Sequence, residues 1–204
     1  MSGDVQVRFC ERLGVKFPRA THLVCGFERQ DDAVRVLEVL HKRMSKYGLT
    51  LHPDKTRLIP FARPRSGQND RSGPGTFDFL GFTIYWCKTR RGVWRPGMKT
   101  RKARIQRTLV TLGDWCRRHR HLPLKEKHAA LSRRLRGHYQ YFGVNGNTRC
   151  LRQVRYQAQR VWFKWLQRRS QRAGRLTWKR FGAYLRAHPL PPPRFCVQIW
   201  ARAP

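Results

Sequence analysis

The stretch FERQDDAVRVLEVL carries the only pair of adjacent acidic residues in the chain, Asp31 and Asp32. Paired carboxylates are what a two-metal polymerase or nuclease uses to hold its ions. Aspartates at the start of a helix have a different role, because they accept hydrogen bonds from free backbone N–H groups and face the positive end of the helix dipole. The few other acids nearby suggest no third metal ligand, so the sequence favours a helix start over a metal site.

The residues around this pair predict a strand followed by an amphipathic helix. Residues 23–27 (LVCGF) form an apolar run that suits a buried strand. Gly48 is expected to end the helix at the C′ position, where a glycine adopts the left-handed conformation. The apolar stripe between these points, at three- and four-residue spacing, consists of Val34, Leu37, Leu40 or His41, and Met44.

The rest of the chain predicts extended segments and then helices. Residues 77–87 and 92–95 are expected to form the two arms of a β-hairpin. After Pro96, apolar residues recur at helical spacing in three stripes, and Thr177 is expected to cap a short fourth helix. The stripes are Ile105, Leu109, Leu112 and Cys116; Leu131, Leu135, Tyr139 and Phe142; and Leu151, Val154, Ala158, Val161, Trp162 and Trp165. We therefore expect an α+β fold that ends in a basic bundle of three or four helices.

The charge of the chain points to an anionic partner. The 204 residues include 45 Lys and Arg against 11 Asp and Glu, a formal net charge of +34. Between Lys99 and Arg186 there are 25 basic residues and two acids, Asp114 and Glu126. Such a segment repels itself unless an anion neutralises it, and arginine suits phosphate and base-face recognition. Nucleic acid, either RNA or DNA, is therefore the expected partner, and a membrane surface is a distant second.

Other classes of protein fit the sequence poorly. The six cysteines are scattered without paired spacing, which argues against a zinc ribbon or a secreted disulfide scaffold. His119 and His121 are expected to add to a basic turn, and no metal site is expected there. No apolar stretch is long enough to cross a membrane, and no signal peptide is visible at the N-terminus. We expect a cytoplasmic protein with no membrane partner. The sequence does not indicate its oligomeric state.

Four stretches, in order along the chain, resemble the C-terminal half of group II intron-encoded reverse transcriptases/maturases. Residues 23–59 resemble the palm helix and the strand after it, with an L-x-P-x-K-T turn, and FDFLGFTI (77–84) is similar to the hairpin that grips the primer end. LRGHYQYFGVNGN (135–147) resembles the RG-x-x-x-Y-F-G signature of the thumb/maturase domain. RLTWKRFGAYLRAHPLPPPR (175–194) is similar to the helix and proline-rich exit that end many bacterial members.

The resemblance implies that the polymerase site is missing. In the family, a Y-A-D-D turn carries the catalytic aspartates just before the strand that here reads LVCGF. The matching positions hold Arg19, Ala20, Thr21 and His22, and neither threonine nor imidazole is a good Mg²⁺ ligand. No catalytic residue and no cofactor is therefore expected, and Mg²⁺ would be needed only if another polypeptide completed the site.

The resemblance also divides the chain into parts. Residues 1–18 form an unmatched N-terminal segment and 19–97 a truncated palm. Residues 98–187 correspond to the thumb/maturase domain, and 188–204 to a proline-rich tail. The expected fold is a partial reverse-transcriptase palm with a β-hairpin, followed by the helical domain.

The candidate RNA-binding residues are cations and aromatic side chains expected on exposed faces, and one glycine that would let a nucleic-acid backbone approach. Lys55 occupies the family's K-T position, near an incoming nucleotide's phosphates, although an exposed lysine on a turn is the simpler interpretation. The candidates are Lys55, Gly81, Lys88, Arg90, Arg91, Arg136, His138, Tyr141, Arg149, Arg152, Arg155, Arg160, Lys164, Arg168, Arg169 and Arg172.

We expect an RNA-binding fragment that assists the folding and splicing of group II intron RNA. Three alternatives stay open: part of an RNA-directed DNA polymerase that a separate N-terminal half completes, a non-functional remnant of a mobile element, and an unrelated basic RNA-binding protein such as a ribosome-associated one. No zinc or H-N-H endonuclease segment follows Pro193, so DNA cleavage is not expected.

Overall fold

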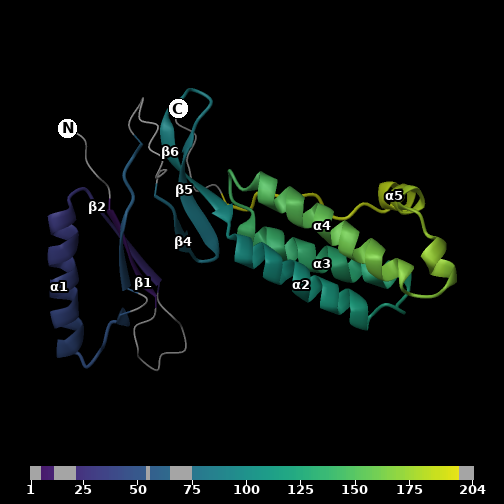
Figure 1. The fold of residues 1–204 in the computed structure, drawn as a ribbon, viewed down its shortest axis with the longest axis horizontal. Coiled ribbons are helices and arrows are strands. Elements are labelled where there is room, and N and C mark those ends of the chain that lie inside the picture. The colour runs from purple at the N-terminus through teal and green to yellow at the C-terminus, as the bar shows by residue number, and fades with distance from the viewer. Residues whose placement is uncertain (1–5, 12–21, 54–55, 65–74, 198–204) are drawn as a thin grey trace. The chain divides into compact units, whose positions relative to one another are not determined.

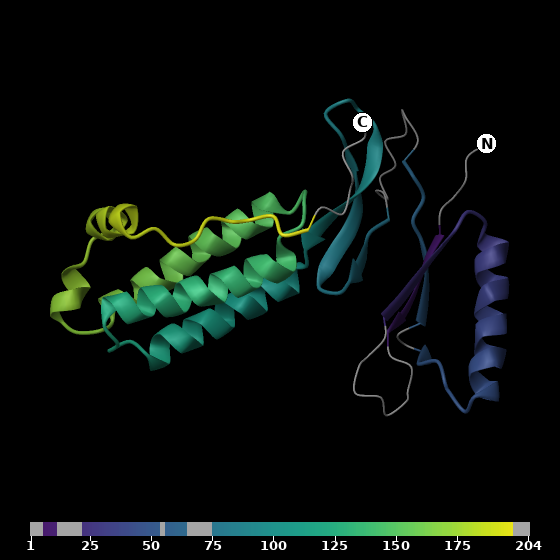
Figure 2. The same cartoon turned by 180° about the vertical axis from the view of Figure 1, so that it is seen from behind.

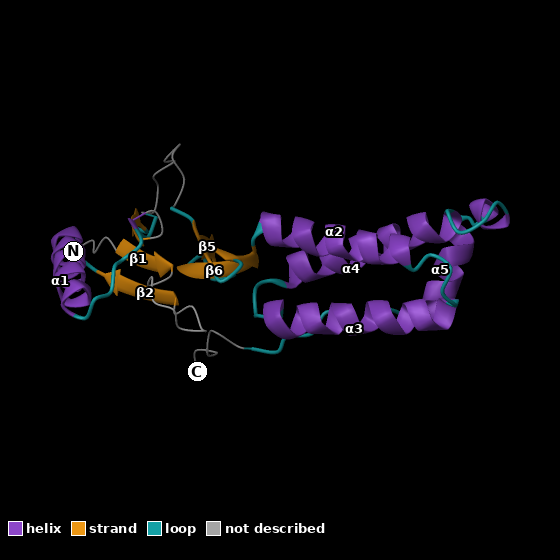
Figure 3. Cartoon of the chain, turned by 90° about the horizontal axis from the view of Figure 1, so that it is seen from below, coloured by secondary structure: helices purple, strands orange, loops and turns teal. Residues whose placement is uncertain are grey.

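The computed structural model describes residues 6–11, 22–53, 56–64 and 75–197 (Figure 1). Helices and strands both contribute, and the fold class is α+β, as predicted (Figure 3). The chain divides into two compact units, unit 1 (residues 1–97) and unit 2 (residues 98–204).

Unit 1 contains a three-stranded antiparallel sheet in the order β2-β1-β3. Its central strand β1 (Gln6–Glu11) pairs with β2 (His22–Phe27) and β3 (Thr56–Pro60). Glu11 pairs with His22 in the first ladder, and Gln6 pairs with Pro60 in the second. His22 is therefore the first residue of a paired strand.

Helix α1 (Gln30–Lys46) follows β2, and its buried side differs in part from the predicted stripe. Ala33 is its only fully buried residue, whereas Val34 is exposed. Leu37, Leu40 and Met44 are half-buried, so the inward positions follow Ala33 by four, seven and eleven residues. The small alanine lies where the predicted stripe placed the larger valine.

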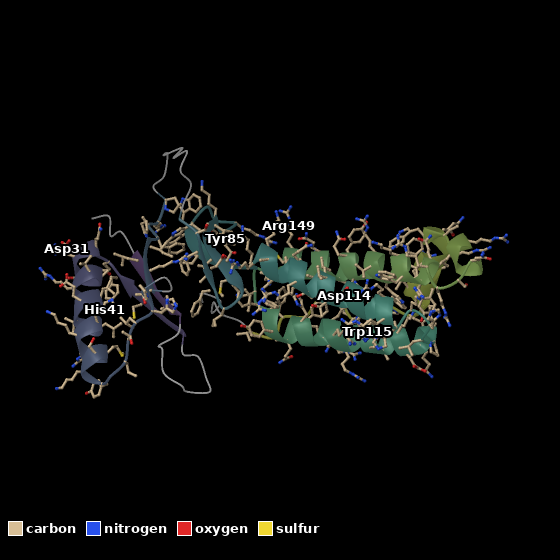
Figure 4. All side chains as sticks on the ribbon, turned by 60° about the horizontal axis from the view of Figure 1, so that its bottom comes forward. Asp31, His41, Tyr85, Asp114, Trp115 and Arg149 are labelled. Carbon is tan, nitrogen blue, oxygen red and sulfur yellow. The ribbon has the colours of Figure 1, made fainter. Side chains whose placement is uncertain are left out.

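The acidic pair lies at the start of α1, but it does not cap the helix. Asp31 and Asp32 belong to the first helical turn, and the N-cap is Arg29, whose side chain makes no capping hydrogen bond (Figure 4 labels Asp31). At this end of the helix their charges interact favourably with the macrodipole. At the other end the prediction is confirmed: Gly48 has φ +66°, and its N–H donates to the carbonyl of Ser45 at 3.0 Å.

A second sheet, in the order β4-β5-β6, follows in the chain. The predicted first hairpin arm is in fact two strands, β4 (Phe77–Phe79) and β5 (Phe82–Lys88), which pair antiparallel across a two-residue turn. Leu80 and Gly81 form this turn with φ values of +47° and +83°. Positive φ at both central positions is the geometry of a tight type I′ hairpin, which the apolar run did not reveal. Strand β6 (Trp94–Thr100) follows the second turn.

An aromatic cluster anchors β4 and β5 in unit 1. Phe61 and Phe77 are buried and meet edge to face, with ring centroids 5.0 Å apart. The ring of Trp86 stacks on Phe61 at 5.1 Å. These contacts show that β4 and β5 pack into the core of unit 1.

Unit 2 consists mainly of helices, and α2, α3 and α4 pack side by side (Figures 1 and 3). They span Lys102–Arg118, Leu124–Phe142 and Thr148–Gln167. Every residue of the second predicted stripe is buried, as are four members of the third. The fourth helix α5 (Trp178–Ala187) begins at Thr177, whose hydroxyl accepts a hydrogen bond from the N–H of Arg180 at 3.3 Å. The predicted cap is confirmed.

Asn147 joins three elements of unit 2. Its side-chain oxygen accepts from the N–H of Thr100 at 2.9 Å, and its amide donates to the hydroxyl of Thr100 at 2.7 Å and to the carbonyl of Phe142 at 2.8 Å. It is buried, so each of these bonds satisfies a group that water does not reach. The loop VNGN is thus a structural joint between α3 and α4.

The proline-rich segment after α5 runs back along the helices of unit 2 (Figure 2, in yellow). Leu190 is fully buried, and Val144 and Val197 form a parallel β-bridge. Gly143, the C-cap of α3, lies against this segment, because a Cβ there would come within 2.4 Å of the carbonyl oxygen of Arg194. The segment is therefore a packed part of unit 2.

Candidate nucleic-acid interface

The outer side of α4 carries a stripe of cations and one aromatic ring, which we call the α4 stripe: Arg149, Arg152, Tyr156, Arg160 and Lys164. All five are exposed, and Arg149 extends outward from the start of the helix (Figure 4). Their spacing of three and four residues puts them on one face, and at ~1.5 Å per residue the stripe is about 22 Å long. The buried residues of α4 lie on the opposite face.

Aromatic rings accompany these cations at the end of α4. A groove of about 730 Å³ is lined by residues of α4 and α5, among them Tyr156, Arg160, Phe163, Lys164 and Trp178. The guanidinium of Arg160 lies 5.9 Å from the centre of the Tyr156 ring, and the rings of Phe163 and Trp178 meet edge to face at 4.9 Å. Exposed rings beside arginines offer stacking surfaces for unpaired bases.

The α4 stripe contains no acidic residue that would form ion pairs within the helix, because none occurs between Thr148 and Gln167. In a helix whose charged residues serve only solubility, acids usually alternate with bases. The charge of this face is therefore available to an anionic ligand.

Four other predicted arginines at α4 and beyond have different surroundings. Arg155 is half-buried, and its Nη2 donates to the carbonyl of Leu190 at 2.9 Å, so it fastens the C-terminal segment. Arg169 is half-buried and donates to the carbonyl of His121 at 3.1 Å. Arg168 is exposed, with its guanidinium 5.5 Å from the centre of the Trp165 ring. Arg172 begins a short 3₁₀ helix (Arg172–Arg175), and its side chain lies outside the described part.

The RG-x-x-x-Y-F-G stretch forms the second half of α3 and ends the helix at Gly143, as expected. Arg136 and Tyr141 are exposed, but the expectation that His138 faces outward is wrong. His138 follows Leu135 by three residues and precedes Phe142 by four, which places it on the buried stripe; its ring centre is 4.7 Å from that of Phe142. Burial lowers the pKa of His138 to about 4.

The predicted residues of unit 1 occupy the turns of its second sheet. Gly81 adopts the positive φ that the β4–β5 turn needs, which is a sufficient structural reason for a glycine there. Lys88 is exposed at the end of β5, with its amine 5.0 Å from the centre of the Trp94 ring, and Arg90 and Arg91 are exposed in the next turn. Lys55 lies outside the described residues.

Sequence reasoning gave no role to two notable residues, Trp178 and Lys127. The sequence predicts Trp178 only as part of a short helix, because its position beside α4 depends on the path of the chain between the two helices. Lys127 is fully buried in α3 and donates to the carbonyl of Arg120. Burial lowers its pKa, with a further contribution from Arg169. The charge pattern gave no signal for this buried lysine.

The described residues contain no cluster of three or more His, Cys, Asp or Glu side chains that could hold a metal ion. The carboxylate of Asp31 lies 3.7 Å from the guanidinium of Arg29, and both side chains are more than two-thirds exposed. Such a surface pair contributes little to stability.

No family model, curated protein or solved structure matches the chain. None of the helices in the described part is long and apolar enough to span a membrane.

Proposed function

We propose that the chain is an RNA-binding protein that recognises structured RNA with unpaired nucleotides through the helical unit 2. The single observation that carries this proposal is the α4 stripe, a face with four exposed cations and a tyrosine, uninterrupted by acids. Phosphates would contact the cations, and the neighbouring rings of Tyr156 and Trp178 would stack on bases.

We further propose that the chain is a fragment of a group II intron reverse transcriptase/maturase, with unit 2 as its thumb/maturase domain and unit 1 as a palm remnant. The support is the ordered resemblance of four sequence stretches. A helical domain that helps an RNA to fold needs affinity and shape recognition, but no carboxylates of its own. The preferred ligand would then be group II intron RNA.

Fluorescence anisotropy with a labelled stem–loop RNA tests the first proposal. The triple variant Arg152→Gln, Arg160→Gln, Lys164→Gln should bind at least tenfold more weakly than the wild type. If each lost phosphate contact contributes about 0.7 to the logarithmic salt dependence, the slope should become less steep by about 2.

A matched control removes the same charge from unit 1. The variant Arg35→Gln, Lys42→Gln, Arg43→Gln neutralises three exposed cations of α1, where Asp31, Asp32 and Glu38 are interspersed. It should retain wild-type affinity apart from a small loss of long-range attraction. Equal losses in the two triple variants would contradict a localised interface.

The family proposal has its own test. A transcript of a group II intron and a ribosomal RNA fragment of the same length are competed against the labelled stem–loop. We expect the intron transcript to compete more effectively. Equal competition would favour a basic RNA-binding protein of another kind.

A further inference from the structure

A second groove in unit 2 lies between α3 and the C-terminal segment. Its volume is about 530 Å³, within the range of small-molecule sites. One wall comes from α3 and the other from residues 189–196. The lining residues include Ser132, Arg136, Tyr139, Pro191, Pro192 and Arg194.

The fold holds the second wall of this groove in place. Leu190 is fully buried, and its carbonyl accepts the hydrogen bond from Arg155. Further along, the N–H of Cys196 donates to the carbonyl of Gly143 at 2.6 Å, and the imidazole Nε2 of His128 lies 3.3 Å from the carbonyl oxygen of Pro189. The groove is thus a fixed feature of unit 2.

Two residues that line this groove, Ser132 and Tyr139, carry buried hydroxyl groups. Ser132 is 3% exposed and Tyr139 is 2% exposed, and neither hydroxyl has a hydrogen-bond partner within the described part of the chain. A buried hydroxyl without a partner is unfavourable, because it has lost its hydrogen bonds to water. Burial also raises the pKa of Tyr139 to about 12, so its hydroxyl stays protonated and can donate to an anion.

The charged residues of the lining are all cationic. Arg136 and Arg194 are exposed, and no aspartate or glutamate lines the groove. Arginine binds phosphate through two parallel hydrogen bonds, and hydroxyl donors can satisfy the remaining oxygens. The proline rings add an apolar surface of a kind that a ribose or a base can pack against.

We propose that this groove binds one unpaired nucleotide of the RNA, with its phosphate held by Arg136, Arg194 and the hydroxyls of Ser132 and Tyr139. The proposal rests on the proposed RNA-binding function and adds to it a site for a single nucleotide, separate from the residues of the α4 stripe. The α4 stripe supplies exposed cations along a helix face, whereas this groove supplies buried donors.

The test uses the full chain with AMP and adenosine as probes, in isothermal titration calorimetry and thermal unfolding. We expect AMP to bind and to raise the melting temperature, and adenosine to bind at least tenfold more weakly because it lacks the phosphate. The double variant Ser132→Ala, Tyr139→Phe should bind AMP at least tenfold more weakly. Without AMP it should be at least as stable as the wild type, because it no longer buries unpaired hydroxyls.

Two further variants change exposed residues only, so their effects on AMP binding do not depend on changes in the core. Arg194→Gln changes an exposed side chain and should also weaken AMP binding about tenfold, whether or not the double variant folds. Tyr47→Phe removes an exposed hydroxyl from unit 1 and should leave AMP binding unchanged. Absence of AMP binding, or AMP binding that survives both Arg194→Gln and the double variant, would overturn the proposal.

The two proposals fail separately. The α4-stripe triple variant should lose affinity for the stem–loop RNA and keep wild-type affinity for AMP. If AMP does not bind but the triple variant still loses RNA affinity, the groove proposal is wrong and the RNA-binding function stands. If AMP binds and the triple variant keeps its RNA affinity, the α4 interface is wrong.

Discussion

Helix α1 of unit 1 and helix α4 of unit 2 have similar apolar patterns but different surroundings. In α4, five residues along one face are buried, among them Leu151, Val154 and Trp162, each with no exposed surface. In α1, only Ala33 is fully buried, and Val39 is 52% exposed. Helix α4 packs between neighbouring helices, whereas α1 packs on one side against a small sheet.

This difference shows what an apolar stripe can and cannot predict. The pattern identifies which face of a helix turns inward, because residues three and four apart share that face. The depth of burial depends on how many other elements cover the face. Deep burial of one side in α4 leaves its opposite side free for a continuous basic surface.

The largest difference in stability between the two helices is expected from a substitution in the core of unit 2. Trp162 has ring contacts with Phe181 at 5.3 Å and Tyr184 at 5.9 Å. Trp162→Ala should lower the free energy of unfolding by about 3–5 kcal/mol, because it leaves a cavity. Val39→Ala in α1 should change it by less than about 0.5 kcal/mol. Urea denaturation followed by circular dichroism measures both. A comparable loss from Val39→Ala would mean that the outer face of α1 is covered in solution.

A second effect concerns pH and sharpens the contrast between buried and exposed histidines. The pKa of His138 is lowered from 6.5 to about 4, so between these values the unfolded state binds a proton that the folded state does not. Its contribution to stability is complete above pH 6.5 and is lost progressively as the pH falls towards 4. His138→Leu should flatten the stability profile in this range, measured by urea denaturation at several pH values.

The control for this prediction is His41→Gln, which changes an exposed histidine of α1. The pH profile of this variant should match that of the wild type. A wild-type pH dependence in His138→Leu would show that another group titrates in this range.

The smallest effects concern the helix caps, which the two units provide differently. Thr177 caps α5 through its side chain, whereas Arg29 at the start of α1 makes no such bond. Arg29 has φ −117° and ψ 141°, the extended conformation that a capping serine adopts. Thr177→Ala should destabilise α5 by about 1 kcal/mol, and Arg29→Ser should stabilise α1 by about 0.5–1 kcal/mol. Hydrogen exchange of the first-turn amides measures each change; unchanged protection in Arg29→Ser would show that α1 gains nothing from a cap.

The sequence by itself determined the α+β class, the inward faces of α2, α3 and α4 with the exception of His138, the end of α1 at Gly48 and the cap at Thr177. These features depend on local periodicity and on backbone preferences that act within a few residues. It also determined that α4 has many cations and no acids, which is the basis of the proposed interface.

Only the tertiary structure decided which of these residues are available to a ligand. Arg155 and Arg160 read alike in the sequence, but one is fastened to Leu190 and the other lies exposed beside Tyr156. Trp178 beside α4, and Ser132 and Tyr139 opposite the proline-rich segment, are brought to their grooves by elements far apart in the chain. The physical reason is that helical periodicity specifies the direction of a side chain, whereas its solvent exposure and neighbours depend on long-range packing.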